Sequence, residues 1–338
     1  MALLTWYYSD AMSIYGTHII NQVQHPLLRP EMGDSTLHVV LVLSNPVRVH
    51  SRLRLFRETL ARMEATRGVT AYVVEAAFGD RDWEVAEAGN PRHLRLRTQS
   101  EIWIKEAMIN LGIKRLLPLG WKYAATVDGD IEFRDAGWAI EATHQLQHFQ
   151  IIQPWSSALD LGPHGNVIQS FKSFGYQHQQ GVSGEMLMRG YAFGHTGFAW
   201  AFTRAFFERT GGLIDFAIAG AGDHHMAWGC IGDFVDASVP KLVSADYKQC
   251  CRAWQSRAQP ITLGQVGFQH GRIEHSFHGS KAKRNYIGRW AYLIANNFQP
   301  TEDLYYDDQG LTQLRGKPAL EAAIRKYNRS RCEDDISE

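Results

Sequence analysis

Hydrophobic residues along this chain alternate between short continuous runs and longer stretches with helical spacing. Residues 37–44 (LHVVLVLS), 69–78 (VTAYVVEAAF) and 121–130 (WKYAATVDGD) are continuous apolar runs, typical of strands buried on both faces of a parallel sheet. Between these runs, residues 52–65 and 100–116 place apolar side chains at the spacing of amphipathic helices. The order strand, helix, strand, helix, strand predicts an α/β fold built on a doubly wound sheet.

The rest of the chain is less regular. Ser100 stands where the N-cap of the second helix is expected. Residues 138–155 are typical of a helix followed by a strand, whereas 160–200 are rich in Gly, His and Gln and are expected to form loops. The polar tail is expected to be helical or loose. The simplest organisation is a lead-in at 1–36, an α/β domain at 37–300 and a C-terminal extension at 301–338.

The composition is that of an ordinary globular protein. Of 338 residues, 45% are hydrophobic. The 35 Lys and Arg residues balance the 35 Asp and Glu residues, so the formal net charge is zero and does not indicate a positively charged surface for nucleic acid. No apolar run approaches the roughly 20 residues that span a bilayer, and the N-terminus lacks the pattern of a signal peptide. Four cysteines without a CxxC pair favour reduced thiols, so we expect a cytoplasmic protein.

The first candidate site is the pair Asp128 and Asp130, which flank Gly129 at the end of the third apolar run. Alternate residues of a strand point to the same side, so both carboxylates are expected to reach one site. Such hard oxygen ligands suit Mg²⁺ or Mn²⁺, which commonly bridge to substrate phosphates. The alternative is a polar turn in which Gly129 adopts an unusual φ.

A second candidate lies in the stretch GLIDFAIAGAGDHHMAWG, where Asp223, His224 and His225 follow two glycines. An acidic or imidazole side chain near the start of a helix, facing a site at the strand ends, is suited to act as a general base. The alternative is that Asp223 only caps the helix that follows.

A third cluster carries nitrogen donors late in the chain. His275 and His278 have the spacing of one helical face or one turn, and the cations Lys281 and Arg284 follow them. One of these histidines could complete a metal site, and the cations could hold a diphosphate. A solvated basic helix has the same pattern and is the alternative.

The segment SNPVRVHSRL follows the first apolar run and carries Asn45, Arg48 and Arg52. Hydrogen-bond donors at the carboxyl end of a strand could bind a nucleotide. The sequence has neither GxGxxG nor GxxxxGK(S/T), so dinucleotide-binding Rossmann and Walker sites have no local support.

Taken in order, these clusters resemble the glycosyltransferases of the GT-A fold, in their galactosyltransferase-like or family 2-like branch. Pro46 and Arg48 match the Pro-x-Arg nucleotide segment of that branch, and VDGDIEF matches the Asp-x-Asp motif at Asp128 and Asp130. The resemblance covers about residues 37–290. Each motif is short, and the specificity lies in their order and spacing.

The later motifs of the family have counterparts as well. Residues 195–225 resemble the segment that precedes the family's catalytic acid, and HSFHG resembles the late metal ligand. His278 is preferred as that ligand because it directly precedes a glycine, and His275 is the second choice. The chain departs from the family at Asp223 and His224, where Glu-Asp is common. Because of this departure, the motif alone does not decide which of the two residues is the base.

The resemblance implies a GT-A domain whose residues 37–135 bind the nucleotide sugar and whose residues 136–300 bind the acceptor and supply the late metal ligand. It implies transfer of a sugar from a nucleoside-diphosphate sugar, with a UDP-sugar favoured, to an acceptor hydroxyl. The residues expected to bind the donor are Ser44, Asn45, Pro46, Arg48, Arg52, Lys105, Asp128, Gly129, Lys281 and Arg284.

The same resemblance implies roles in catalysis. Mn²⁺ or Mg²⁺ would be held by Asp128, Asp130 and His278 and would neutralise the departing diphosphate. Asp223 would be the general base of an inverting reaction, with His224 as the alternative.

Other classes of protein share parts of this pattern. The sequence DHH resembles the DHH phosphoesterases, although their late Gly-Gly-Gly-His motif is missing, and a carbohydrate-binding protein would not need the metal and base clusters together. Trp200, Trp228 and Tyr191 are candidates for stacking on sugar faces, although aromatic residues more often belong to the core. The acceptor stays open between a saccharide, a lipid, a protein and a hydroxylated base in DNA.

Overall fold

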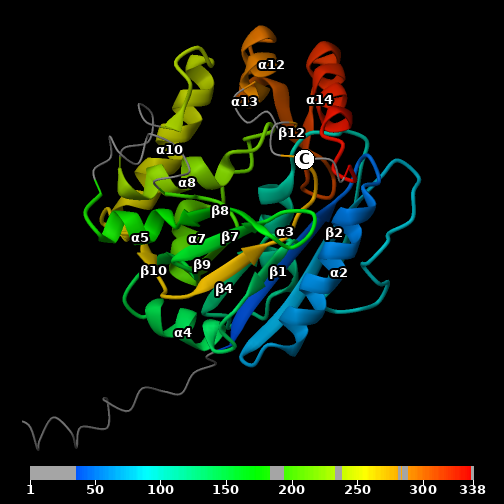
Figure 1. Cartoon of the computed structure of the whole chain (residues 1–338). Coiled ribbons are helices and arrows are strands. Elements are labelled where there is room, and N and C mark those ends of the chain that lie inside the picture. The colour runs from blue at the N-terminus through cyan, green and yellow to red at the C-terminus, as the bar shows by residue number, and fades with distance from the viewer. Residues whose placement is uncertain (1–35, 183–193, 233–237, 281–282, 284–287, 336–338) are drawn as a thin grey trace, which may run out of the picture. The chain divides into compact units, whose positions relative to one another are not determined.

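The centre of the structure is a mixed sheet of seven strands (Figure 1). The computed structural model describes residues 36–182, 194–232, 238–280, 283 and 288–335. The strands of the sheet are β1 (Leu37–Ser44), β2 (Val69–Phe78), β3 (His93–Thr98), β4 (Tyr123–Val127), β6 (Ile151–Gln153), β9 (Ala199–Thr203) and β10 (Gly267–Phe268). Their order is β10-β6-β9-β4-β1-β2-β3, and β9 runs antiparallel to both of its neighbours. The predicted α/β fold with a mixed sheet is confirmed.

Helices connect the strands and cover the sheet (Figure 1). Within the described residues they are α2 (His50–Ala65), α3 (Lys105–Leu116), α4 (Trp138–Gln145), α5 (Phe174–Gln179), α7 (Arg204–Thr210), α8 (Gly222–Ile231), α10 (Ala245–Thr262), α12 (Arg289–Ala295), α13 (Pro300–Asp303) and α14 (Pro318–Ser330). The prediction that Ser100 caps the second helix is wrong, because Ile104 precedes the first turn of α3 and no side chain caps it. Ile102 and Ile104 are buried in the core, so the helix begins only after them.

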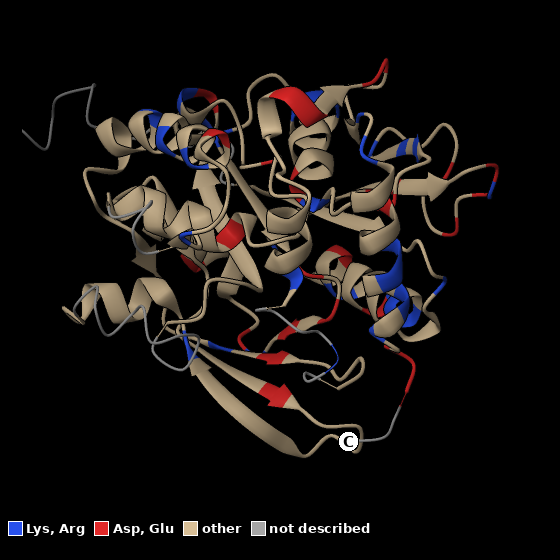
Figure 2. Ribbon diagram, turned by 90° about the horizontal axis from the view of Figure 1, so that it is seen from above, with Lys and Arg blue, Asp and Glu red and all other residues tan. Residues whose placement is uncertain are grey.

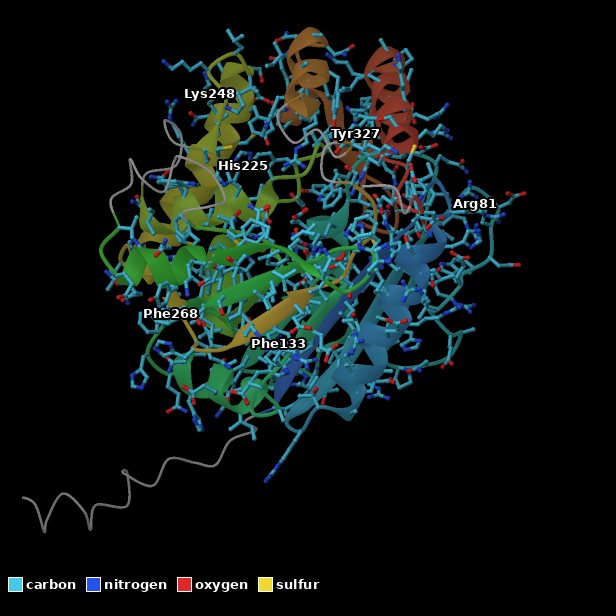
Figure 3. The ribbon with its side chains drawn as sticks, in the orientation of Figure 1. Arg81, Phe133, His225, Lys248, Phe268 and Tyr327 are labelled. Atoms are coloured by element: carbon cyan, nitrogen blue, oxygen red, sulfur yellow. The ribbon has the colours of Figure 1, made fainter. Side chains whose placement is uncertain are left out.

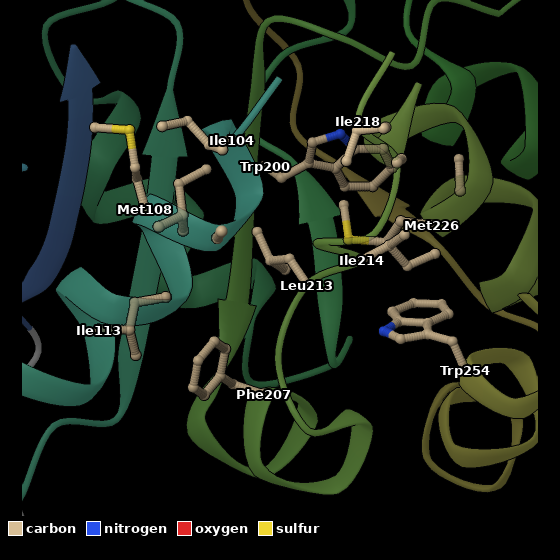
Figure 4. Packing of buried hydrophobic residues seen from close by; sticks show 14 of the residues in the cluster. Ile104, Met108, Ile113, Trp200, Phe207, Leu213, Ile214, Ile218, Met226 and Trp254 are labelled. Carbon is tan, nitrogen blue, oxygen red and sulfur yellow. The ribbon is translucent and has the colours of Figure 1, made fainter. Parts of the chain in front are cut away.

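The residues of β1 explain why helices lie on both faces of the sheet. Val39 and Leu41 belong to one buried cluster, whereas Val40 between them belongs to another, because successive side chains of a strand point to opposite faces. α2 packs Phe56 into the first cluster, and α3 packs Met108 into the second (Figure 4). The sheet is therefore doubly wound, as its apolar runs predict.

A second, smaller sheet lies beside the central one. Its strands are β5 (Ile131–Phe133), β7 (Ser157–Leu161), β8 (Val167–Lys172) and β11 (Arg272–His275), in the order β5-β11-β7-β8. The expectation of loops at 160–200 is therefore wrong for β8 and α5. All but one of the residues of β8 are exposed, so this strand has no apolar period to reveal it. Residues 183–193 lie outside the described part of the chain.

The C-terminal extension carries regular structure rather than a loose tail. β12 (Leu304–Tyr306) pairs with β13 (Thr312–Leu314), and α14 follows beside α12 (Figure 1). Asn328 donates a hydrogen bond of 2.8 Å to the carbonyl oxygen of Glu101. Arg329 forms an ion pair of 2.9 Å with the carboxylate of Glu101. The extension thus packs on the segment that leads into α3. Among the described residues no helix is long and apolar enough to cross a bilayer.

The contact of α3 with the sheet gives a test of this packing. A Cβ at Gly112 would lie 2.7 Å from Cγ2 of Val74 and 2.8 Å from Cγ1 of Val40, both in the core. We expect Gly112→Leu to lower the free energy of unfolding by about 2–3 kcal/mol, because an overpacked core forces the helix away from the sheet. Gly120→Leu is the control, since a Cβ there has no heavy atom within 4 Å. Equal denaturation midpoints for the two variants in urea would contradict this packing.

Candidate active site

One cavity of about 400 Å³ lies at the carboxyl ends of β1 and β4, where ligands of open α/β sheets bind. Ser44 ends β1, and Asp128 to Asp130 follow β4 directly. The same cavity reaches His275 at the end of β11 and Asp223 in the first turn of α8. Segments far apart in the chain therefore bring polar side chains to one place.

A group suited to bind a metal ion lies in this cavity and consists of Asp130, His275 and His278. The pairing of β5 with β11 sets Ile131 opposite His275, and the amide of Ser276 donates a hydrogen bond of 2.9 Å to the carbonyl oxygen of Asp130. Oδ2 of Asp130 lies 2.9 Å from Nε2 of His278 and 3.6 Å from Nε2 of His275. The two Nε2 atoms are 3.3 Å apart. Three ligand atoms thus converge on one point.

The chemistry of this group fits a divalent cation. Oδ1 of Asp130 is buried and has no hydrogen-bond partner among the described residues, and burial without a partner is costly. Although burial acts in the opposite direction, His275 and His278 hold the pKa of Asp130 well below its usual range, so the carboxylate is charged. Imidazole nitrogen with carboxylate oxygen suits Mn²⁺ and related ions.

Asp160 supports this group from β7 and was missed in the sequence. The parallel pairing of β7 with β11 sets Asp160 opposite His275, and Oδ1 of Asp160 lies 2.5 Å from Nδ1 of the histidine. The sequence signal was a charged residue at an inward position of the alternating strand SALDL, in which Ala158 and Asp160 are buried. A carboxylate in this position orients a histidine ligand.

The two aspartates of the VDGD motif have separate partners. Asp128 forms an ion pair with Lys105, the first residue of α3, whereas Asp130 faces the histidines. β4 ends at Val127, so Asp128 to Asp130 form a turn into β5 and do not follow the pleat that the sequence interpretation assumed. Gly129 is needed there for close packing, because an added Cβ would lie 2.9 Å from Cδ2 of Phe56. The structure thus places His275, rather than Asp128, with Asp130 and His278.

Asp223 lines the cavity apart from the metal group, in the first turn of α8. Its Oδ1 accepts a hydrogen bond of 2.8 Å from the amide of His224. Burial raises the pKa of Asp223, the cation of Lys105 opposes this, and the charge of Asp128 adds to it. Glu106 is a buried carboxyl that does not line the cavity, and burial raises its pKa to about 7 although Lys105 opposes the shift. Asp223 is therefore a cavity-lining carboxyl whose negative charge is poorly stabilised.

The histidines that follow Asp223 are placed differently. His224 is not among the residues that line the cavity, and burial together with Arg289 lowers its pKa to about 4. His225 is fully buried, with Nε2 at 2.9 Å from the hydroxyl of Tyr247 and Nδ1 at 3.2 Å from that of Ser238. His225 therefore belongs to a polar network inside the core.

The residues expected to bind a donor divide into two sets. Ser44, Pro46 and Arg52 line the cavity with Lys105, Asp128 and Gly129. Asn45 instead holds its own turn through hydrogen bonds with the amide and carbonyl of Val49, at 2.9 and 3.0 Å. Arg48 is exposed and lines a separate small cavity with Asn45. Lys281 and Arg284 lie outside the described residues.

The aromatic residues proposed for sugar stacking do not reach the cavity. Trp200 and Trp228 are 2% and 1% exposed, and both belong to the apolar core. Figure 4 shows Trp200 within it. That interpretation is wrong for both residues, and Tyr191 lies outside the described residues. Other aromatic side chains line the cavity, among them Tyr327 of α14, labelled in Figure 3. These are Phe56, Trp103, Phe171, Phe198, Tyr292 and Tyr327.

Neither a protein-family model nor a curated protein sequence matches the chain. The structure is similar to the Drosophila β-1,4-galactosyltransferase 7, solved with manganese, UDP-Gal and xylobiose, at 11% identity over 84% of this chain and 98% of that chain, with a TM-score of 0.41. It is similar to a mannosyltransferase from Pyrobaculum calidifontis, solved with GDP-Man and Mn²⁺, at 13% identity over 97% and 81%, with a TM-score of 0.38.

A third solved structure is described as a putative nucleotide-diphospho-sugar transferase from Desulfovibrio desulfuricans. It is 11% identical over 86% of this chain and 98% of that chain, with a TM-score of 0.31.

Proposed function

We propose that this protein is a metal-dependent glycosyltransferase that moves a sugar from a nucleoside-diphosphate sugar to an acceptor hydroxyl. One observation carries the proposal: a ligand group for a divalent cation and a separate, partly buried carboxylate, Asp223, line the same cavity at the strand ends. Transfer needs a cation for the leaving diphosphate and a base for the acceptor, whereas a simple binding protein needs neither. The order of motifs in the sequence supports the same function.

The donor diphosphate would lie between the metal ligands and fixed cations. A bound Mn²⁺ or Mg²⁺, held by Asp130, His275 and His278, would supply Lewis-acid stabilisation of the negative charge that develops on the leaving diphosphate. Arg52 and Arg289 line the same cavity and provide positive charge that is in place before the reaction. A UDP-sugar is the donor that the motifs favour.

The acceptor hydroxyl would be activated by Asp223. Its carboxylate would take the hydroxyl proton while the acceptor oxygen bonds to the anomeric carbon and the bond from that carbon to the diphosphate breaks on the opposite face. The products are an inverted glycoside and a nucleoside diphosphate. The raised pKa of Asp223 makes the carboxylate a stronger base, whereas the lowered pKa of His224 makes that side chain a weaker one.

A saccharide is the acceptor class that we favour. Acidic and basic residues are interspersed over the described elements (Figure 2), whereas a surface for DNA needs clustered cations. The phosphoesterase alternative has less support. Within the described residues, the group suited to a metal contains neither Asp223 nor His224 nor His225.

The metal group can be tested with nucleotides alone. For the wild-type chain we expect Mn²⁺ and UDP together to raise the melting temperature more than either alone, because a ligand that binds only the native state stabilises it. Asp130→Asn should lose this joint effect. Asp128→Asn should keep the effect of Mn²⁺ alone, because Asp128 pairs with Lys105 and not with the histidines. The metal assignment is wrong if adding EDTA to the wild type in the presence of Mn²⁺ and UDP leaves its melting temperature unchanged. It is also wrong if Asp128→Asn and Asp130→Asn lose the effect of Mn²⁺ to the same extent.

The base can be tested by kinetics. We expect Asp223→Asn to lower kcat on the order of 10²–10⁴-fold with little change in the KM for the donor, because an amide cannot accept the proton. In the wild type, activity should rise with pH through the raised pKa of Asp223, which lies above the ordinary carboxyl value of about 4. Asp215→Asn is the control, since burial also raises the pKa of Asp215 but this residue does not line the cavity. A similar loss of kcat in both variants would refute the assignment.

A further inference from the structure

Glu333, in the segment that follows α14, reaches the metal group from the far end of the described chain. Its side chain is 2% exposed, and Oε2 lies 3.4 Å from Nδ1 of His278. The other ring nitrogen of His278, Nε2, is 2.9 Å from Oδ2 of Asp130. The imidazole therefore stands between two carboxylates, one at each nitrogen.

The second histidine has the same arrangement. Nδ1 of His275 lies 2.5 Å from Oδ1 of Asp160, and its Nε2 lies 3.6 Å from Oδ2 of Asp130. A neutral imidazole carries one N–H, and a carboxylate at Nδ1 accepts that N–H and leaves the lone pair of Nε2 for a cation. Both histidines are thus turned with Nε2 toward Asp130 by a buried carboxylate at the opposite nitrogen.

We propose that Glu333 is a positioning residue of the metal site, which holds His278 in the Nδ1–H tautomer with Nε2 directed at the cation. This inference rests on the metal group of the proposed function. It assigns the C-terminal segment a part in cation binding, although that segment supplies no ligand of its own.

The surroundings of Glu333 keep its carboxylate charged and in place. Arg52 donates to Oε2 at 3.2 Å and to Oε1 at 2.6 Å, and Nε of Arg331 lies 2.7 Å from Oε1. The backbone also approaches closely, because Gly279 has a φ of +90° and an added Cβ would lie 2.8 Å from Cα of Glu333.

The neighbouring residue provides a matched control. Asp334 accepts hydrogen bonds from the amides of His50 and Ser51, at 2.8 and 2.7 Å, and so fixes the same segment to the start of α2. Asp334→Asn therefore loosens the segment at the start of α2 and leaves the carboxylate of Glu333 at Nδ1 of His278 in place. In Glu333→Gln the single side-chain oxygen remains for the arginines, and the amide presents N–H groups to Nδ1, which favours the wrong tautomer.

The experiment measures Mn²⁺ binding to the full chain, without any sugar nucleotide, from the loss of the free-ion signal in electron paramagnetic resonance. We expect Glu333→Gln to raise the Kd for Mn²⁺ by about 10-fold or more, the usual effect of losing a residue that orients a metal-binding histidine. Asp334→Asn should bind as the wild type does, and His278→Ala should bind most weakly. Circular dichroism checks that each variant is folded.

A second measurement needs no variant at position 333. Long-range proton–nitrogen correlation spectra of the wild type loaded with diamagnetic Zn²⁺ should give His278, assigned by its loss in His278→Ala, as the Nδ1–H tautomer, because the cation then takes the place of the proton between Nε2 and Asp130. An Nε2–H tautomer, equal Mn²⁺ affinity in Glu333→Gln and wild type, or an equal loss in Asp334→Asn would each overturn the role of Glu333. Absence of Mn²⁺ binding by the wild type would instead overturn the proposed function, and this inference with it.

Discussion

The candidate site depends on the pairing of β11 with its two neighbours in the small sheet. The antiparallel pairing with β5 brings His275 beside Asp130, and the parallel pairing with β7 brings Asp160 to the same histidine. A shift of one residue in either register would turn these side chains to the other face of the sheet. The large sheet supplies the base of the cavity, but the small sheet determines which polar groups meet.

The carboxylates in and around the cavity differ in the positive charge that surrounds them. Asp128 has Lys105, Asp130 has two histidines and Glu333 has two arginines. Burying charge is costly unless it is paired, and each of these three carboxylates has partners that can carry the opposite charge. Among the described residues, the amide of His224 is the hydrogen-bond partner of Asp223, and Lys105 only partly offsets the effect of burial, so the pKa of Asp223 stays raised. Asp223 lines the cavity and is therefore suited to exchange protons with a bound molecule, whereas Glu106, whose pKa is also raised, does not line the cavity.

The sequence predicted the central strands well and the site only in part. β1 and β2 occupy the predicted ranges because their apolar runs are buried on both faces, whereas β3 (HLRLRT) was missed because it is an edge strand with arginines at alternate positions. Residue types identified Asp130, His278 and Asp223 as candidates. Which of these residues meet depends on the geometry of turns and on the register between segments that are distant in the sequence. The different partners of Asp128 and Asp130, and the contact of Glu333 with His278, therefore could not be predicted from the residues around them.

The contact between Glu333 and His278 has a consequence for the order of events during synthesis. The two residues are 55 positions apart (333 minus 278), and all three ligand side chains precede Glu333 in the chain. At roughly 5–20 residues per second, translation of that interval takes several seconds. During that time the nascent chain would contain all three ligand side chains, but the imidazole of His278 could adopt either tautomer because Glu333 would not yet be in place. Tight capture of the cation would then follow the docking of α14 rather than the folding of the sheets.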